Sequence, residues 1–372
     1  MDMKPSIYDQ SLEALQEQLR LLGEPSYRSK QVFQWLYRRD VRSFQAMTDL
    51  SESLRAQLDE RFSCGDTELA ERHRAEDDGA TKCVIRLSDG ETVESVLIPT
   101  PTRLTGCIST QVGCKFACTF CASGIAGFVR NLSAGEIIQQ VLWLNRLAVV
   151  ESGGSRLTHI VFMGIGEPLD NYEALRQAIG VLTAPSAVGM SSRRLTVSTC
   201  GVATKIDRLA EDGVRVHLSI SLHGATDRVR GALMPVNRAY PLQRLLESCQ
   251  RYRRSSRHDL TFEYILLEGK NDRSSDAERL ALHAKQLGAK VNLIPYNPVD
   301  GLAFRTPSHE RVEAFQRRLV ARGVVATVRW SRGGQVDAAC GQLRIRRRAR
   351  VATEAVRGDG RAPKKSASAC ER

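Results

Sequence analysis

The sequence has no apolar run that approaches the ~20 residues needed to span a bilayer. It also has no secretory signal, because residues 1–12 carry acidic side chains and contain no apolar core. We therefore expect a cytoplasmic protein without membrane contact. Its 372 residues, 42% of them hydrophobic and 26% charged, are enough for one large globular domain with an appendage or for two ordinary domains.

A disulfide framework is not expected for ten cysteines in a cytoplasmic protein, and metal or redox chemistry is the usual alternative. The cysteines are unevenly distributed along the chain. Four of them lie between Cys107 and Cys121, and the others stand alone at positions 64, 83, 200, 249, 340 and 370. Such clustering is what a metal site requires.

Three of the clustered cysteines, Cys114, Cys118 and Cys121, form a C-x3-C-x2-C triad in the segment GCKFACTFCASG. A 4Fe-4S cluster commonly has four cysteine ligands, so a triad leaves one iron open to bind and activate a substrate. A zinc site is the alternative. Zinc usually needs a second pair of ligands, and the sequence has no second C-x2-C and no H-x3-H. The triad predicts a 4Fe-4S cluster with an open iron, as in radical S-adenosylmethionine (SAM) enzymes.

The net charge of +12 is not spread evenly. Segment 344–372 carries ten Lys/Arg and three Asp/Glu, which supplies +7, whereas residues 1–63 carry nine basic and ten acidic side chains. A basic tail can bind polyanions non-specifically or only aid solubility. Its low hydrophobicity predicts that most of it is disordered. Charge alone does not establish binding to RNA.

Residues 1–63 are predicted to form a small helical domain. Leucines at 12, 15, 19 and 22 predict one helix that ends at Gly23, and segments 30–39 and 51–62 are predicted to form two more. Tyr27, Trp35 and Tyr37 lie among basic side chains, which would suit RNA binding with stacking support. Burial of these aromatics in the core is the more common outcome.

Residues 64–102 are predicted to form a short β extension, with strands in CVIRLSDG and ETVESVLIP joined by a turn at Asp89 and Gly90. Alternation along VESVLI places Glu94 on the same face as Val96 and Ile98. An inward carboxylate must be paired or used chemically. The alternative is a glutamate that reaches solvent at a strand end, and the pattern alone favours this alternative.

From residue 103 short apolar strands alternate with amphipathic helices, and we assign a catalytic domain to 103–343. The expected strands are 104–110, 157–163, 195–199, 214–221, 260–267 and 291–296. The expected helices are 133–147, 172–182, 202–211, 242–255, 276–287 and 310–322, and a late strand covers 324–330. Six βα units with right-handed crossovers predict an α/β fold with a partial (β/α)6, TIM-like barrel.

In such barrels the chemistry lies at the C-terminal ends of the strands. The cysteine loop follows the first strand, and the segment GIGEP (164–168) follows the second. Its glycines allow a ligand close to the backbone, and Glu167 can accept a hydrogen bond from a cationic amine. Ser198, the Ser-Leu-His run at 221–223 and Asn297 follow later strands. Each could hydrogen-bond a nucleoside, although singly each is more often a turn or cap residue.

Two further cysteines are placed near the predicted rim. Cys107 lies in the strand that leads into the cysteine loop, and Cys340 lies in DAACGQL after the last strand. A lone buried cysteine is usually inert. If both thiols face the rim, Cys340 is a candidate covalent carrier and Cys107 a partner thiol.

From about residue 27 to residue 343 the sequence resembles the RlmN/Cfr family of dual-specificity RNA adenosine methyltransferases, within the radical SAM superfamily. The most specific shared segments are VESVLIP (93–99), CISTQVGCKFACTFCASG (107–124), FMGIGEP (162–168), SISLH (219–223) and DAACGQL (337–343). Cys340 in its context separates this family from most radical SAM enzymes. The GEP and QVGC segments resemble RlmN more than Cfr, which favours methylation of adenine C2 over C8.

The resemblance implies a role for each candidate residue. The triad would ligate the cluster, Cys340 would carry the methyl group, Cys107 would be its transient disulfide partner, and Glu94 would accept a proton. The residues implied to bind SAM are Gly166, Glu167, Ser198, Ser221, Leu222, His223 and Asn297. One SAM would methylate Cys340. A second SAM at the open iron would be cleaved to a radical that activates the S-methyl group for addition to the base.

The partners implied by the resemblance are RNA, either 23S rRNA, tRNA or both, and an electron donor such as flavodoxin or ferredoxin. The N-terminal helical domain would bind RNA, and we expect a monomer. The alternatives are C8 specificity, a different RNA target, another acceptor for the radical chemistry, and a non-catalytic RNA-binding protein that contains a metal.

Overall fold

A computed structural model describes residues 4–125, 127–330, 333–339 and 341–343. The predicted carrier Cys340 and the basic tail 344–372 lie outside the described residues. No helix within the described ranges has the length and hydropathy of a membrane span.

The N-terminal part contains the three predicted helices, α1 (Leu12–Leu21), α2 (Tyr27–Tyr37) and α3 (Glu52–Arg61). The hydroxyl groups of Ser11 and Ser51 cap α1 and α3, and each accepts a hydrogen bond from the amide three residues on. The aromatic side chains divide into two groups. Trp35 and Tyr37 are buried, as expected for a core, whereas Tyr27 is 53% exposed and the prediction of burial was wrong for it.

Polar contacts attach these helices to α5 (Ala134–Ser152). In the first turn of α5, the amide of Gly135 donates to Asp9 Oδ1 at 2.7 Å, where the helix dipole favours a carboxylate. Further along α5, Arg146 donates twice to the Asp40 carboxylate, at 2.5 Å each. A Cβ at position 135 would lie 2.8 Å from Asp9 Oδ1, so this docking requires a glycine there.

A ten-stranded sheet runs through the rest of the chain in the order β1-β2-β3-β4-β7-β8-β9-β10-β11-β12. The antiparallel strands are β1 (Glu68–Arg74), β2 (Thr81–Arg86), β3 (Thr92–Thr100) and β4 (Arg103–Cys107). The strands parallel to β4 are β7 (His159–Phe162), β8 (Leu195–Thr199), β9 (His217–Ser221), β10 (Leu260–Leu266), β11 (Lys290–Pro295) and β12 (Ala326–Val328). Strands β1 to β3 therefore extend the same sheet.

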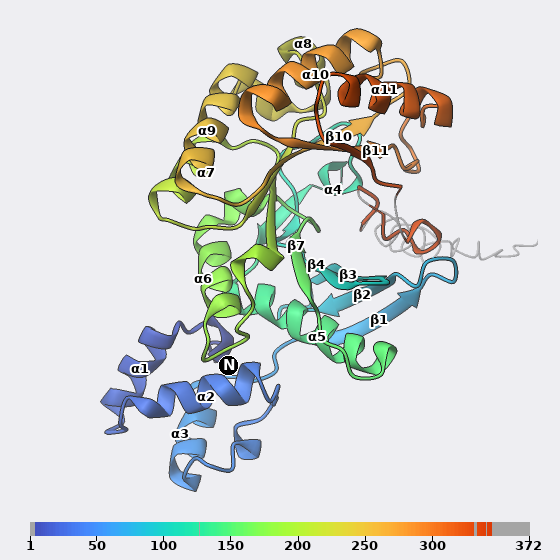
Figure 1. The fold of residues 1–372 in the computed structure, drawn as a ribbon. Helices are drawn as coiled ribbons and strands as arrows, with labels where there is room; N and C mark the ends of the chain where they lie inside the picture. Colours follow the sequence, from blue (N-terminus) through green and yellow to red (C-terminus); the bar gives the residue numbers. More distant parts are fainter. Residues whose placement is uncertain (1–3, 126, 331–332, 340, 344–372) are drawn as a thin grey trace, which may run out of the picture.

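Helices connect the parallel strands and lie around the outside of the curved sheet (Figure 1). After α5 they are α6 (Tyr172–Thr183), α7 (Ala203–Glu211), the short α8 (Asp227–Leu233), α9 (Leu242–Ser255), α10 (Ser274–Leu287) and α11 (His309–Ala321). The predicted alternation is confirmed. Within the described ranges no ladder joins β12 to β4, so the parallel part is an open, partial (β/α)6 barrel.

A hairpin that carries the cysteine triad was not predicted. Strands β5 (Gln111–Gly113) and β6 (Phe128–Asn131) form a hairpin outside the main sheet, and the cysteine triad lies in the loop between them. Gly113 has φ +80°, and a Cβ there would lie 1.9 Å from the carbonyl oxygen of Gly127. The amide of Cys114 donates to the same oxygen at 2.9 Å. The hairpin therefore closes the base of the cysteine loop.

Candidate active site

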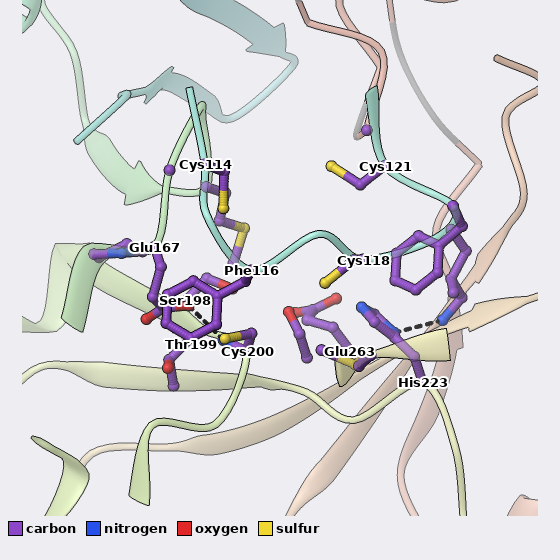
Figure 2. A pocket seen from close by; sticks show the side chains of 18 of the residues that line it. Cys114, Phe116, Cys118, Cys121, Glu167, Ser198, Thr199, Cys200, His223 and Glu263 are labelled. Carbon is purple, nitrogen blue, oxygen red and sulfur yellow. Dashed lines mark hydrogen bonds between the residues drawn. The ribbon is translucent and has the colours of Figure 1, made fainter. Parts of the chain in front are cut away.

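The cysteine loop and the strand ends surround one cavity. The predicted site residues on its wall are Cys114, Cys118, Cys121, Gly166, Glu167, Ser198, Ser221 and His223. Figure 2 shows the three thiols on one loop, with Glu167, Ser198 and His223 facing them from the strand ends. The barrel topology brings these residues together because the C-terminal ends of parallel strands meet at one edge.

The three thiols fit the chemistry of a metal cluster. Burial raises the pKa of Cys114 to about 12, and burial also raises the pKa of Cys118 well above its ordinary value. Such buried thiols become thiolates when a cation compensates them. No set of His, Cys, Asp and Glu side chains in the described ranges converges on a single metal ion. In a 4Fe-4S cluster each thiolate binds a different iron, so its ligands are spread more widely than those of one ion.

The GIGEP segment packs tightly against the start of the cysteine hairpin. A Cβ at Gly164 would lie 2.6 Å from Ser109 Oγ, and a Cβ at Gly166, which has φ +103°, would lie 2.6 Å from Gln111 Cβ. Close backbone packing therefore requires these glycines, in addition to any approach of a ligand. This reason was not visible in the sequence, because it depends on the hairpin.

Glu167 is held in one orientation by backbone amides. Its side chain is buried, and its two carboxylate oxygens accept hydrogen bonds from the amides of Leu169 at 3.0 Å and Cys200 at 2.6 Å. Burial raises the pKa of Glu167, and these hydrogen bonds act in the opposite direction. The remaining lone pairs of the carboxylate can accept from a ligand in the cavity.

His223 is a neutral ring with a fixed tautomer. The amide of Ile265 donates to its Nδ1 at 3.0 Å. The ring of Phe120 packs edge-on against the imidazole, with 5.0 Å between the ring centroids. Burial lowers the pKa of His223 to about 3. The ring therefore carries its proton on Nε2 at neutral pH, and this N–H is the donor available to a ligand. The backbone of His223 has φ 54°, which a hydrogen bond from Asn271 Nδ2 to its carbonyl oxygen supports.

Two of the predicted SAM-binding residues are not on the cavity wall. The side chain of Leu222 is completely buried in the hydrophobic core, and its amide donates to the carbonyl oxygen of Glu263 at 3.0 Å. Asn297 follows β11 and is half-buried, but it is not one of the described residues that line this cavity. Any contact from Leu222 to a ligand would come from its backbone.

A second cavity adjoins the first and shares Cys121, Gly164 and Gly341 with it. Cys107 of β4 and Ala339 also line it. Cys340 stands between Ala339 and Gly341 in the sequence and lies outside the described residues. None of the eight described cysteines forms a disulfide with another described cysteine, and the predicted Cys107–Cys340 pair includes a residue outside the described ranges.

Glu94 is buried, with 7% of its surface exposed, so the alternative of a solvent-exposed strand end is wrong. Its carboxylate lies 3.6 Å from Lys82 Nζ. Val96 is directly opposite Cys107 in the β3–β4 ladder. Because Glu94 is two positions from Val96 on the same strand, Glu94 and Cys107 share one face of the sheet.

Two buried polar residues near the site were not predicted from the sequence. Glu263 of β10 lines the first cavity, and its Oε1 accepts from Ser219 Oγ at 3.2 Å and Asn292 Nδ2 at 3.0 Å. Its Oε2 has no hydrogen-bond partner among the described residues. Gln140 of α5 accepts from the amide of Ser109 at 2.9 Å and donates to its carbonyl oxygen at 3.0 Å. Gln140 therefore ties α5 to the segment that leads into the cysteine loop.

Arg230 of α8 is a third such residue and is 0% exposed. Its guanidinium donates to the carbonyl oxygen of Cys200 at 2.6 Å and to Asn237 Oδ1 at 2.7 Å. Asn237 is the last residue of the segment MPVN (234–237). The segment therefore holds the buried guanidinium of Arg230 through the side chain of Asn237.

Two family models match the chain. The model of the radical SAM superfamily matches residues 108–281, and that of the ribosomal RNA large subunit methyltransferase N-terminal domain matches residues 6–64. A probable dual-specificity RNA methyltransferase RlmN of Heliobacterium modesticaldum is 45% identical over 327 residues, which cover 87% of this chain and 85% of the relative. This chain belongs to the RlmN family.

Other comparisons agree with membership of the RlmN family. The dual-specificity RNA methyltransferase RlmN of an Anaeromyxobacter species is 44% identical over 364 residues, which cover 97% of this chain and 94% of the relative. The crystal structure of a radical SAM methyltransferase from Sphaerobacter thermophilus has a TM-score of 0.87 and 43% identity over 92% of this chain and 99% of that chain. The predicted family and enzyme class are confirmed, and radical SAM enzymes use a 4Fe-4S cluster and SAM.

Proposed function

We propose that this protein methylates C2 of an adenosine in RNA (23S rRNA, tRNA or both) through a methyl group carried on Cys340. The observation that carries the proposal is the pair of adjoining cavities. One is lined by the cysteine triad and Glu167, and the other by Cys107 and the sequence neighbours of Cys340. Relatives over nearly the whole chain are named dual-specificity RNA methyltransferases, which favours this reaction over the alternatives.

Cys114, Cys118 and Cys121 would hold the 4Fe-4S cluster, which supplies the electron that cleaves SAM. Glu167 offers carboxylate lone pairs, and His223 offers its Nε2–H for hydrogen bonds to SAM. The hydroxyl groups of Ser198 and Ser221 line the same wall. The backbone of Gly166 and Leu222 and the side chain of Asn297 would complete the binding site. Phe116 and Phe120 on the cavity wall would exclude water.

Adenine C2 is not nucleophilic, so it cannot attack the methyl carbon of SAM, whereas the thiolate of Cys340 can attack it and displace S-adenosylhomocysteine. Glu94 would accept the proton that leaves C2. Its burial on the same face as Cys107 supports this role. Cys107 Sγ would attack Cys340 Sγ, so that a sulfur–sulfur bond forms as the bond from Cys340 Sγ to the transferred carbon breaks. The electron pair of the broken bond would stay on that carbon, which takes up a proton to become the methyl group. The odd electron of the adduct would leave before this step, with the cluster as the available acceptor.

The remaining assignments concern domains and partners. The helical domain at 1–63 would bind RNA, with exposed Tyr27 and the guanidinium of Arg28 over its ring at 5.1 Å as one contact surface. Segment 64–102 would connect it to the catalytic domain at 103–343, and the tail 344–372 would add non-specific attraction to RNA. We propose a cytoplasmic monomer that receives electrons from flavodoxin or ferredoxin.

The carrier role is tested by mass spectrometry of the protein. Anaerobically purified chain incubated with SAM should show a methyl group on the peptide that contains Cys340. A Cys340→Ala variant should bind iron as the wild type does and transfer no methyl group to RNA. Cys370→Ala is the matched control and should retain transfer. Methyl transfer by Cys340→Ala would contradict the proposal.

A further inference from the structure

One tryptophan differs from the other two in this protein. Trp35 is buried, and the indole N–H of Trp143 donates to Thr67 Oγ1 at 3.0 Å. Trp330, two residues after the end of β12, is 49% exposed. An indole ring is a large apolar surface, and one held in water next to a cavity points to a binding surface.

A second ring packs against Trp330. The imidazole of His309, at the start of α11, lies parallel to the indole, with an angle of 2° between the planes and 5.1 Å between the ring centroids. His309 Nδ1 is in turn 3.4 Å from Glu313 Oε1 one helical turn later. One face of the indole is therefore covered by the imidazole ring of His309.

Trp330 lies on the wall of the cavity that contains Cys107 and Cys121. Arg103, at the start of β4, lines the same cavity, and Arg329 lines both this cavity and the first one, where its charge acts on Glu263. An aromatic ring and cationic side chains on one cavity wall match the chemistry of a single-stranded nucleic acid, whose bases stack and whose phosphates are anionic.

We infer that Trp330, backed by His309, is a stacking platform for a nucleobase adjacent to the target adenosine. This inference rests on the proposed function. A base that enters a cavity must leave its own stack, and its neighbour then loses a stacking partner. The indole would replace that partner at the mouth of the cavity, and it would accept any base because every base has a flat π face.

The test is an RNA titration that does not depend on catalysis. Transcripts of 23S rRNA fragments and of tRNA are titrated into the anaerobic holoenzyme, and binding is followed by filter retention. Trp330→Ala should raise the dissociation constant about tenfold, the typical loss for one aromatic stack, and Trp330→Phe should restore most of the affinity. Val320→Ala, an exposed apolar residue (55%) on the same helix as His309, is the control and should bind as the wild type does.

Salt dependence separates stacking from charge. The slope of log affinity against log salt should be unchanged in Trp330→Ala, because no phosphate contact is lost, and should become shallower in Arg103→Gln. In the shortest transcript that the wild type methylates, 2-aminopurine next to the target adenosine should be quenched by the wild type and less so by Trp330→Ala.

Three outcomes would overturn the inference. The first is wild-type affinity in Trp330→Ala, and the second is a changed salt slope in that variant. The third is a Trp330→Ala protein that binds RNA normally but loses turnover when flavodoxin is the reductant and not with a chemical reductant. That result would assign the surface to the electron donor. The proposed function has a separate test, because it fails if the wild type methylates no RNA. In that case the titration would still measure whether Trp330 contributes to RNA binding.

Discussion

Replacing Arg230 by methionine should destabilise the protein by roughly 2–6 kcal/mol. The guanidinium is completely buried and donates to the carbonyl oxygen of Cys200 and to Asn237 Oδ1, at 2.6 and 2.7 Å. Methionine fills the space of the arginine stem but leaves both acceptors without donors inside the core. Each buried acceptor that loses its partner costs about 1–3 kcal/mol, which gives the stated range for two.

The measurement is urea unfolding of the cluster-free protein under anaerobic conditions, followed by circular dichroism. Arg228→Met is the matched control, because Arg228 lies on the same helix and is exposed. This control should stay within about 0.5 kcal/mol of the wild type. Because Arg230 also anchors the carbonyl of Cys200, whose amide orients Glu167, the variant should bind SAM more weakly at equal iron content. An Arg230→Met protein within about 1 kcal/mol of the wild type would refute this reasoning.

Three further predictions follow from single sites. Gly166→Ala should destabilise the protein by about 2–5 kcal/mol, because the backbone at this position is left-handed and the added Cβ would overlap Gln111. Gly180→Ala, in the exposed part of α6, is the control and should stabilise the protein by about 0.5–1 kcal/mol. Urea unfolding measures both changes. Burial lowers the pKa of His223 from 6.5, its value in the unfolded chain, to about 3 in the folded protein. Below pH 6.5 the unfolded chain therefore binds a proton that the folded protein does not, and the free energy of unfolding decreases as the pH falls from 6.5 toward 3. The loss should be about 2 kcal/mol at pH 5 and absent in His223→Gln. Glu94→Gln should slow RNA methylation by 100-fold or more, a typical general-base effect, while the methylation of Cys340 measured by mass spectrometry stays at the wild-type level.

The fold could be predicted from the sequence where the pattern is local. Buried parallel strands and amphipathic helices each carry their own hydrophobic period, so every βα unit from residue 103 onward was found. The β5–β6 hairpin was missed because its strands are only three and four residues long and are separated by the cysteine loop. Segments this short have no measurable period, and their pairing depends on Gly113 and Gly127 meeting closely.

The site could be predicted where its residues stand at strand ends or in a spaced motif. The triad, Glu167, Ser198 and His223 were found in this way and line one cavity. The burial of Glu94 was missed because its ion pair with Lys82 depends on the pairing of β2 with β3. Arg230 was missed because an arginine in an amphipathic helix is normally exposed, and its partner Cys200 is 30 residues away.

The central claim is that this chain places a methyl group on adenine C2 of RNA. Liquid chromatography and mass spectrometry of nucleosides from RNA incubated with the holoenzyme, SAM and a reductant test it most directly. RNA from cells that lack the enzyme is the substrate, and Cys340→Ala is the negative control. The account predicts 2-methyladenosine with the wild type alone. Formation of 8-methyladenosine, or cleavage of SAM without any methyladenosine in 23S rRNA or tRNA, would contradict it.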